Sequence, residues 1–377
     1  MRGRIVFLFL LTMLLLVPGT ESRAGEKDII DWKDSISLEE AEKVFDDLQE
    51  GEEKFSIIKY VEKVQKGEAD FSFSELIQQG INHITSQFDQ QKGILFRIMA
   101  LGILAGIFMN FSDTIGEKSL GETGFYITYT LLVTTVAASF YTAFSVAKES
   151  IDNLLVFMKV LIPSFSLSLC LDGGTGSSIA FYETMLLVIA LIETVMAYIF
   201  LPGVQVYFLL SMMNPLADNH FSRITSLVGS FLHLGIRVLF GVLIGYQGIQ
   251  GLLLPVMDKV KNNTVLKTAK GLPMVGNTME SVADTLFGSG MLIKSAVGVG
   301  GLVCILILCF YPVLKLIVFV VMFQIGGALV QPVSDKRMVL AMEATAKSGK
   351  LLLGYVFAGA LMFLLSITIV LVSTNIV

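Results

Sequence analysis

Six ionisable side chains of this 377-residue chain lie inside otherwise apolar stretches, where burying a charge is energetically costly. They are Arg97, Lys159, Glu183, Glu193, Arg237 and Lys315. A charge at the centre of a bilayer costs at least about 2.5–3.5 kcal/mol on insertion scales. Lys159, Glu183 and Lys315 lie near the ends of their stretches, so their charged heads can reach water. Glu193 and Arg237 lie deeper and are the stronger candidates for function.

Two roles are open for Glu193 and Arg237. They could pair with each other, or they could line a polar path for conduction or coupling. His233 precedes Arg237 by four residues, so both lie on one helical face, and the neighbouring positive charge favours a neutral imidazole. Gln247 and Gln250, in the segment GYQGIQG, could line a wet cavity or hydrogen-bond across helices.

The motifs that carry enzyme chemistry are absent from the sequence. It contains no HExxH, GxSxG or Walker A motif, and the three cysteines lie in apolar runs without a CxxC or Cys/His cluster. We therefore expect no catalytic residues, no metal, no cofactor and no nucleic-acid partner. Any energy for transport has to come from a partner protein or a gradient.

The elements that position these residues are expected to be membrane-spanning helices. Hydrophobic residues make up 54% of the chain and charged residues 16%, against about 25% charged in soluble domains. The apolar residues also fall in long runs, which is typical of an all-α polytopic membrane protein.

The first 24 residues have the pattern of a cleavable signal peptide. Arg2 and Arg4 precede a short apolar stretch, and small residues flank Arg23 at a cleavage site. An uncleaved first anchor is the alternative. In both cases residues 25–91 are exported.

The exported segment is acidic and predicted to be helical. Residues 25–91 hold 17 acidic and 7 basic residues, whereas 92–377 hold 14 acidic and 17 basic. Ser37 and Glu40 form a capping box that begins an amphipathic helix, and two more such helices follow. A segment of this size has a marginal core, so its apolar faces should pack on each other, on the membrane domain or on a partner.

Residues 92–377 are predicted to cross the membrane about eight times. The predicted spans are 93–112, 124–146, 154–171, 178–201, 224–254, 295–311, 313–331 and 351–373. The sixth and seventh form a hairpin broken near Tyr311 and Pro312, since proline cannot continue the helical hydrogen bonds.

Lysine and arginine predict the direction of these spans. Lysines cluster in the loop 255–294, and basic residues cluster again at 336–350. Because basic loops stay in the cytoplasm, both segments should face the cytoplasm, opposite to residues 25–91.

Glycine pairs with GxxxG spacing indicate close helix packing. Gly102 and Gly106 form one pair, and Gly241 and Gly245 form another. Small residues let helices approach closely in lipid, either within one bundle or between copies in a homo-oligomer.

Four segments of the chain resemble a known family. They are LIPSFSLSLCLDGGTGSSIAFYE at 161–183, AKGLPMVGNTMESVADTLFGSGMLIKSAVGVGG at 269–301, YPVLKLI at 311–317 and QPVSDKR at 331–337. Together they resemble the stage III sporulation protein AE family of endospore-forming bacteria, over nearly the whole chain. The residues of the 255–294 loop region in the family pattern are Lys270, Pro273, Gly276, Asp284, Lys294 and Gly298.

The resemblance implies a channel or export-complex subunit in the mother-cell membrane around the forespore, needed for late forespore gene expression. Its implied partners are the other proteins of the same operon, namely a secretion-type ATPase and ring-forming membrane proteins, together with a forespore channel protein and membrane lipid. Residues 25–91 would lie in the space between the two membranes. An independent secondary transporter and a structural anchor for the rings are the alternatives.

Overall fold

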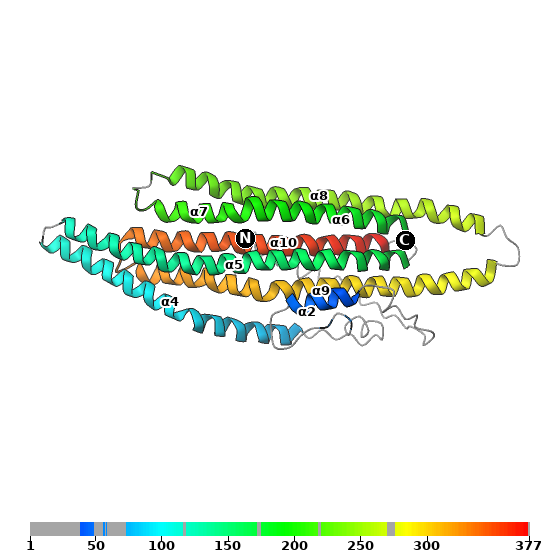
Figure 1. Ribbon diagram of the computed structural model, residues 1–377, viewed down its shortest axis with the longest axis horizontal. Helices are drawn as coiled ribbons and strands as arrows, with labels where there is room; N and C mark the ends of the chain where they lie inside the picture. The colour runs from blue at the N-terminus through cyan, green and yellow to red at the C-terminus, as the bar shows by residue number, and fades with distance from the viewer. Residues whose placement is uncertain are drawn as a thin grey trace.

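The computed structural model describes residues 38–48, 56, 58, 73–115, 118–171, 175–217, 220–269 and 276–375. Every regular element among them is a helix, and the long helices lie side by side in an elongated bundle (Figure 1). The elements are α2 (Leu38–Leu48), α4 (Phe73–Ile115), α5 (Lys118–Leu171), α6 (Thr175–Val195), η1 (Met196–Phe200), α7 (Leu201–Met213), α8 (Ser222–Ala269), α9 (Gly276–Val330) and α10 (Lys336–Asn375).

The described chain has six helical rods that are long and apolar enough to cross a membrane. They are α4, α5, the continuous rod α6–η1–α7, α8, α9 and α10. At a rise of 1.5 Å per residue, the longest rods measure about 80 Å, whereas the hydrocarbon core of a bilayer is about 30 Å thick. The protein is therefore an all-α polytopic membrane protein, as the sequence predicts, and its rods extend beyond the bilayer.

The structure does not have the eight predicted spans. The spans 124–146 and 154–171 belong to one helix, α5, and 295–311 and 313–331 belong to another, α9. The predicted break at Pro312 is wrong, because α9 continues through that residue. Proline removes one hydrogen bond, and packing of neighbouring helices around the buried ring makes this tolerable in a membrane helix.

The continuity of α5 leaves one rod fewer before the 255–294 segment than the predicted spans require. The predicted spans gave five crossings between residues 91 and 255, whereas the four rods α4, α5, α6–η1–α7 and α8 lie there in the structure. Figure 1 shows α2 in the same half of the bundle as the adjoining ends of α8 and α9. If each rod crosses once, residues 255–294 share the side of α2, whereas the eight predicted spans place them on opposite sides; the predicted sidedness stays a prediction.

A π-helical turn joins α6 to α7. It spans Met196–Phe200, and Pro202 follows in the first turn of α7. The proline ring would clash with the carbonyl of residue 198 in a regular α-helix, and the wider π-turn relieves that clash. The rod therefore stays continuous, and Met196, Phe200 and Val204 all face the core.

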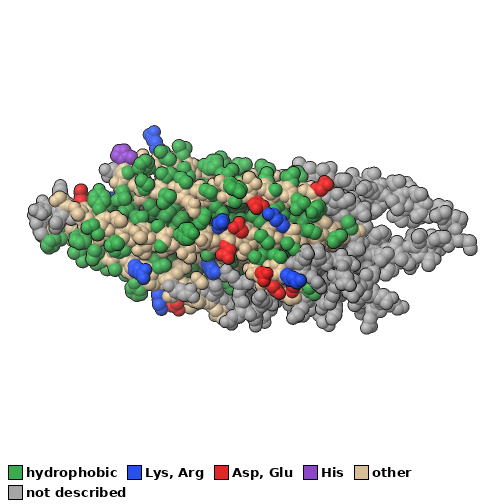
Figure 2. Space-filling view, in the orientation of Figure 1, with side chains coloured by type: hydrophobic (Ala, Val, Ile, Leu, Met, Phe, Trp, Pro, Cys, Tyr) green, Lys and Arg blue, Asp and Glu red, His purple; other side chains and the backbone are tan. Residues whose placement is uncertain are grey.

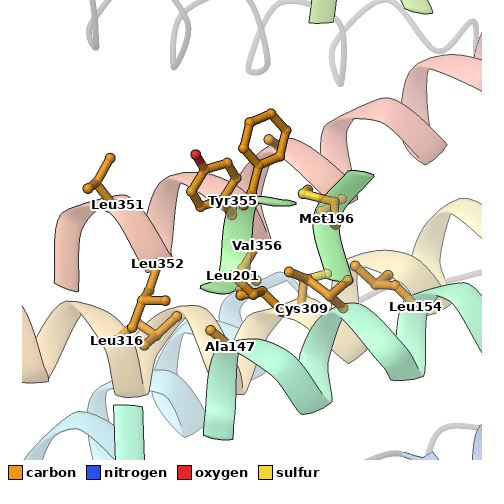
Figure 3. Packing of buried hydrophobic residues seen from close by; sticks show 14 of the residues in the cluster. Ala147, Leu154, Met196, Leu201, Cys309, Leu316, Leu351, Leu352, Tyr355 and Val356 are labelled. Atoms are coloured by element: carbon orange, nitrogen blue, oxygen red, sulfur yellow. The ribbon is translucent and has the colours of Figure 1, made fainter. Parts of the chain in front are cut away.

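The centre of the bundle is α10. Tyr355 is fully buried there, stacks on Phe200 with ring centroids 4.9 Å apart, and donates its hydroxyl to the carbonyl of Leu232 on α8 at 3.0 Å. Figure 3 shows Tyr355 and Val356 of α10 close to Met196 and Leu201 of the α6–α7 rod. Tyr129 makes the equivalent bond from α5 to the carbonyl of Met212, at 2.8 Å. Since each tyrosine buries a ring and satisfies its hydroxyl, both tie neighbouring rods together.

Candidate functional site

An open polar groove of about 590 Å³ lies where α7, α8 and α10 meet. Its lining includes hydroxyl groups, one imidazole and two cationic side chains, which is unusual in an apolar bundle. The lining residues are Tyr207, Asn214, Ser222, Thr225, Ser226, Gly229, Ser230, His233, Leu234, Arg237 and Lys347. The groove is the best candidate for a functional site among the described residues.

Helix α8 supplies most of the lining through a polar stripe. Ser222, Ser226, Ser230, His233 and Arg237 follow one another at spacings of three or four residues. Residues at that spacing stand one above another on the surface of an α-helix. The stripe therefore places three hydroxyls, an imidazole and a guanidinium along one side of the groove.

Outside this stripe, few of the described side chains of α8 are buried. Leu232, Leu239 and Leu243 are buried along one narrow seam, whereas Phe231 and Val238 are more than half exposed. A membrane helix with such a seam presents its apolar side to lipid. The polar stripe consequently borders an apolar surface on the same helix.

His233 and Arg237 lie on one helical face, and both line the groove. The Nδ1 atom of His233 lies 2.8 Å from the carbonyl oxygen of Gly229. A carbonyl only accepts hydrogen bonds, so Nδ1 carries the proton and Nε2 is the other ring nitrogen left for a ligand. Within the described residues, Arg237 makes no hydrogen bond and no ion pair, and its side chain is exposed.

Glu193 is paired with a different residue from the one considered in the sequence. Its Oε2 atom lies 2.7 Å from Nζ of Lys159 on α5, and both side chains are about half exposed. No ion pair in the described chain joins Glu193 to Arg237. The two residues that the sequence singled out therefore belong to separate sites. Figure 2 shows charged side chains gathered near the middle of an otherwise apolar face.

The two glycine pairs have different surroundings. A Cβ at Gly102 would come 2.5 Å from Cγ1 of Val330, and one at Gly106 would overlap the carbonyl oxygen of Val333. That pair lets α4 pack directly on the end of α9. A Cβ at Gly241 or Gly245 would meet nothing within 4 Å, so the second pair makes no such contact with the residues that the structure describes.

Most of the other predicted site residues lie outside the described side chains. Lys270 and Pro273 are outside the described residues, and the side chains of Gln247, Gln250, Asp284 and Lys294 are also outside the description. Gly276 is the first residue of α9. Gly298 is described and buried, and a Cβ there would lie 2.6 Å from Cδ2 of Leu371. The close approach of α9 to α10 depends on that glycine.

Helix α2, which lies within residues 25–91, packs on the membrane bundle. Phe45 is fully buried, and its ring centroid lies 5.6 Å from that of Phe157 on α5. Of the three predicted destinations for the apolar faces of 25–91, α2 uses the membrane domain. The last of the three helices predicted within 25–91, at residues 73–88, is instead the first part of α4.

Sequence reasoning missed Lys347 and the serine stripe. Lys347 was assigned to a basic loop, but it lies on α10, pairs with Glu343 at 3.0 Å and lines the groove. The repeat of serine at 222, 226 and 230 was the available signal, because a spacing of three or four residues continues through His233 to Arg237. The described residues hold no group of three or more His, Cys, Asp or Glu that could bind a metal ion.

Comparisons with known proteins point to one family. The profile of the family described as Stage III sporulation protein AE matches residues 55–374. Over 331 residues the chain is 21% identical to a protein of Bacillus subtilis (strain 168) named Stage III sporulation protein AE. That match covers 86% of this chain and 80% of the relative. No solved structure matches the chain.

Proposed function

Because this chain belongs to the stage III sporulation protein AE family, we propose that it is a membrane subunit of the channel or export complex that links mother cell and forespore. The resemblance seen in the four sequence motifs is thus confirmed at the level of the family. The family is one of sporulation membrane proteins and is not a known enzyme family. The protein acts as an integral membrane subunit of the assembly, and late forespore gene expression depends on it.

The length of the rods supports a subunit of a larger assembly. Rods of about 80 Å leave roughly 50 Å outside a bilayer of about 30 Å. Such a body offers helical surface to proteins on the faces of the membrane as well as within it. The docking of α2 through Phe45 supports the same role, because it fixes the exported segment to the body.

The proposed location is the mother-cell membrane around the forespore. In this arrangement α2 faces the space between the two membranes, where ring-forming proteins and the forespore channel protein can contact it. The α9–α10 connection, followed by Lys336 and Arg337, faces the mother-cell cytoplasm, where the secretion-type ATPase acts. Residues 255–294 then lie on the side of α2.

Cysteine labelling in sporulating cells tests this placement. Single cysteines replace Asp47 on α2, Val265 on α8 and Val333 in the α9–α10 connection, in a chain from which Cys170, Cys304 and Cys309 have been removed. An impermeant thiol reagent should label positions 47 and 265 from the same side and position 333 from the other. If 265 shares the compartment of 333, an additional crossing exists and the six-rod topology is wrong.

Photo-crosslinking tests the role in the assembly. A photoreactive residue at Asp47 should capture ring-forming or forespore proteins, and one at Val333 should capture the ATPase or an associated cytoplasmic protein. The same probe at Leu227 on α8, which is 70% exposed and lies in neither of these two segments, is the control. Absence of operon partners at both Asp47 and Val333 would contradict the proposed function.

The groove favours one alternative, an independent secondary transporter. A polar groove with His233 and Arg237 inside a candidate span is the kind of site at which a transporter binds its substrate or a proton. Replacement of Arg237 by Met would then abolish function in an assembled complex, with Glu193→Gln as the matched variant outside the groove. A complex subunit should tolerate both changes or fail to assemble.

A further inference from the structure

We propose that the groove between α7, α8 and α10 binds the phosphate of an anionic phospholipid, with Arg237, Lys347 and the serine hydroxyls of α8 as its donors. The ligand class is a phosphate-bearing anion, and the membrane is its source. Three independent properties of the groove lead to this assignment.

The first property is an excess of positive charge. The described lining contains Arg237 and Lys347 but no carboxylate. Glu343 offsets part of the charge of Lys347 from one turn away, whereas Arg237 has no hydrogen bond or ion pair with any described residue. A guanidinium without a neighbouring negative charge, within an apolar span, is stabilised by a bound anion. A phosphate suits this role because it accepts two parallel hydrogen bonds from the guanidinium.

The second property is a row of unused donors. The hydroxyls of Ser222, Ser226 and Ser230 make no hydrogen bond with described residues, unlike that of Thr225, which donates to the carbonyl of Phe221 at 2.9 Å. Serines in membrane helices usually bond to the carbonyl four residues back, as Ser211 does here at 2.7 Å. The three free hydroxyls can therefore donate to the oxygens of a headgroup.

The third property is the apolar surface beside the groove. Leu234 lines the groove and is 56% exposed, and Leu227, Phe231 and Val238 on the same helix are also more than half exposed. A phospholipid matches this pattern, because its phosphate can occupy the polar stripe while its acyl chains lie along the apolar side of α8. Basic pockets between membrane helices are a recurring form of headgroup site.

Native mass spectrometry of the delipidated full-length protein in detergent tests the proposal. Phosphatidylglycerol should bind more tightly than phosphatidylcholine, and Arg237→Gln should weaken phosphatidylglycerol binding by about tenfold or more, since a charge-assisted contact is lost. Lys347→Gln should weaken it less, because Glu343 already pairs with that lysine. Inorganic phosphate is titrated in parallel and should compete only weakly, since it lacks the acyl chains.

Matched variants separate the groove from the general charge of the surface. Arg223→Gln removes an exposed arginine on α8 outside the groove, and Lys350→Gln removes an exposed lysine on α10 outside it. Both should leave phosphatidylglycerol binding unchanged. Equal binding of the two lipids, or equal losses in Arg237→Gln and Arg223→Gln, would overturn the proposal. Arg237-dependent binding of inorganic phosphate at the affinity of the lipid would overturn it too, because the ligand would then be a soluble phosphate compound.

Discussion

Helices α8 and α10 are neighbours with almost the same hydropathy and opposite roles in packing. The candidate span in α8 has a mean hydropathy of 2.0 and that in α10 has 2.2, yet 22% of the first and 61% of the second are buried inside the protein. On α10, buried residues occupy most of the circumference, whereas on α8 they form one seam. Mean hydropathy therefore indicates that a helix can lie in the membrane, but it does not indicate how much of the helix is buried. The positions of the small and polar residues along the helix indicate which faces contact other helices.

The largest expected difference between the two helices comes from deleting an aromatic ring. Phe363 on α10 is 1% exposed, and Phe231 on α8 is 56% exposed. Phe363→Ala should cost about 3–5 kcal/mol of stability, because it leaves a cavity, whereas Phe231→Ala should change it by less than about 0.5 kcal/mol. Thermal unfolding of the two variants in the same detergent measures both, and similar losses would remove the contrast between the helices.

Adding a methyl group should have the next largest effect. A Cβ at Gly349 on α10 would lie 2.7 Å from Cδ1 of Phe319, whereas one at Gly241 on α8 meets nothing. Gly349→Ala should destabilise the protein by about 1–3 kcal/mol through overpacking. Gly241→Ala should stabilise it by up to about 1 kcal/mol, because alanine favours the helix. The same unfolding assay checks the opposite signs, and a destabilised Gly241→Ala would indicate a contact that this chain alone does not provide.

The bond that joins the two helices should have a smaller effect. Tyr355→Phe removes the hydroxyl that donates to the carbonyl of Leu232 and keeps the buried ring. We expect a loss of about 1 kcal/mol. Hydrogen exchange should also quicken in α8 more than in the interior of α10, since α8 is buried along one seam and α10 over most of its circumference. Tyr198→Phe, at a residue that is 78% exposed, is the control and should change neither quantity.

The smallest effect is expected on the exposed face of α10. Glu343 and Lys347 form an ion pair four residues apart, with both side chains more than half exposed. Glu343→Gln should cost about 0.2–0.5 kcal/mol, and the cost should fall with salt. A loss above 1 kcal/mol in unfolding experiments would show that the face of α10 that carries Glu343 and Lys347 is buried against something. In that case α10 would have no exposed face, in contrast to α8.

The fold class and helix α2 could be predicted from the sequence. The predicted breaks within two long helices were wrong, because those helices are continuous. The capping box at Ser37 and the apolar periodicity after it led to the helix that the structure has at Leu38–Leu48. A break was predicted at Pro312 and another between the spans 124–146 and 154–171, yet α9 and α5 run through these positions. Proline weakens a helix locally, and only the packing of neighbouring rods decides whether the helix ends there.

The candidate site shows a similar division. The spacing of His233 and Arg237 was enough to place both on one face, because helical periodicity is a local property. The partner of Glu193 is Lys159, 34 residues earlier in the chain, and the lysine of the groove comes from α10. Those neighbours depend on which rods lie side by side, and periodicity within one segment holds no information about that.

The π-turn at Met196–Phe200 makes the α6–α7 rod tolerant of a change in length at one place only. Its hydrogen bonds reach five residues back instead of four, so it stores one residue more than an α-turn. Deleting one residue there, together with replacing Pro202, whose ring needs the wider turn, can close it into an ordinary α-turn while Phe208 and Met212 keep facing inward. The same deletion within α7, before Leu209, would rotate all later side chains by about 100° and turn the exposed Leu209 inward. Insertions and deletions among related sequences should therefore collect at this turn.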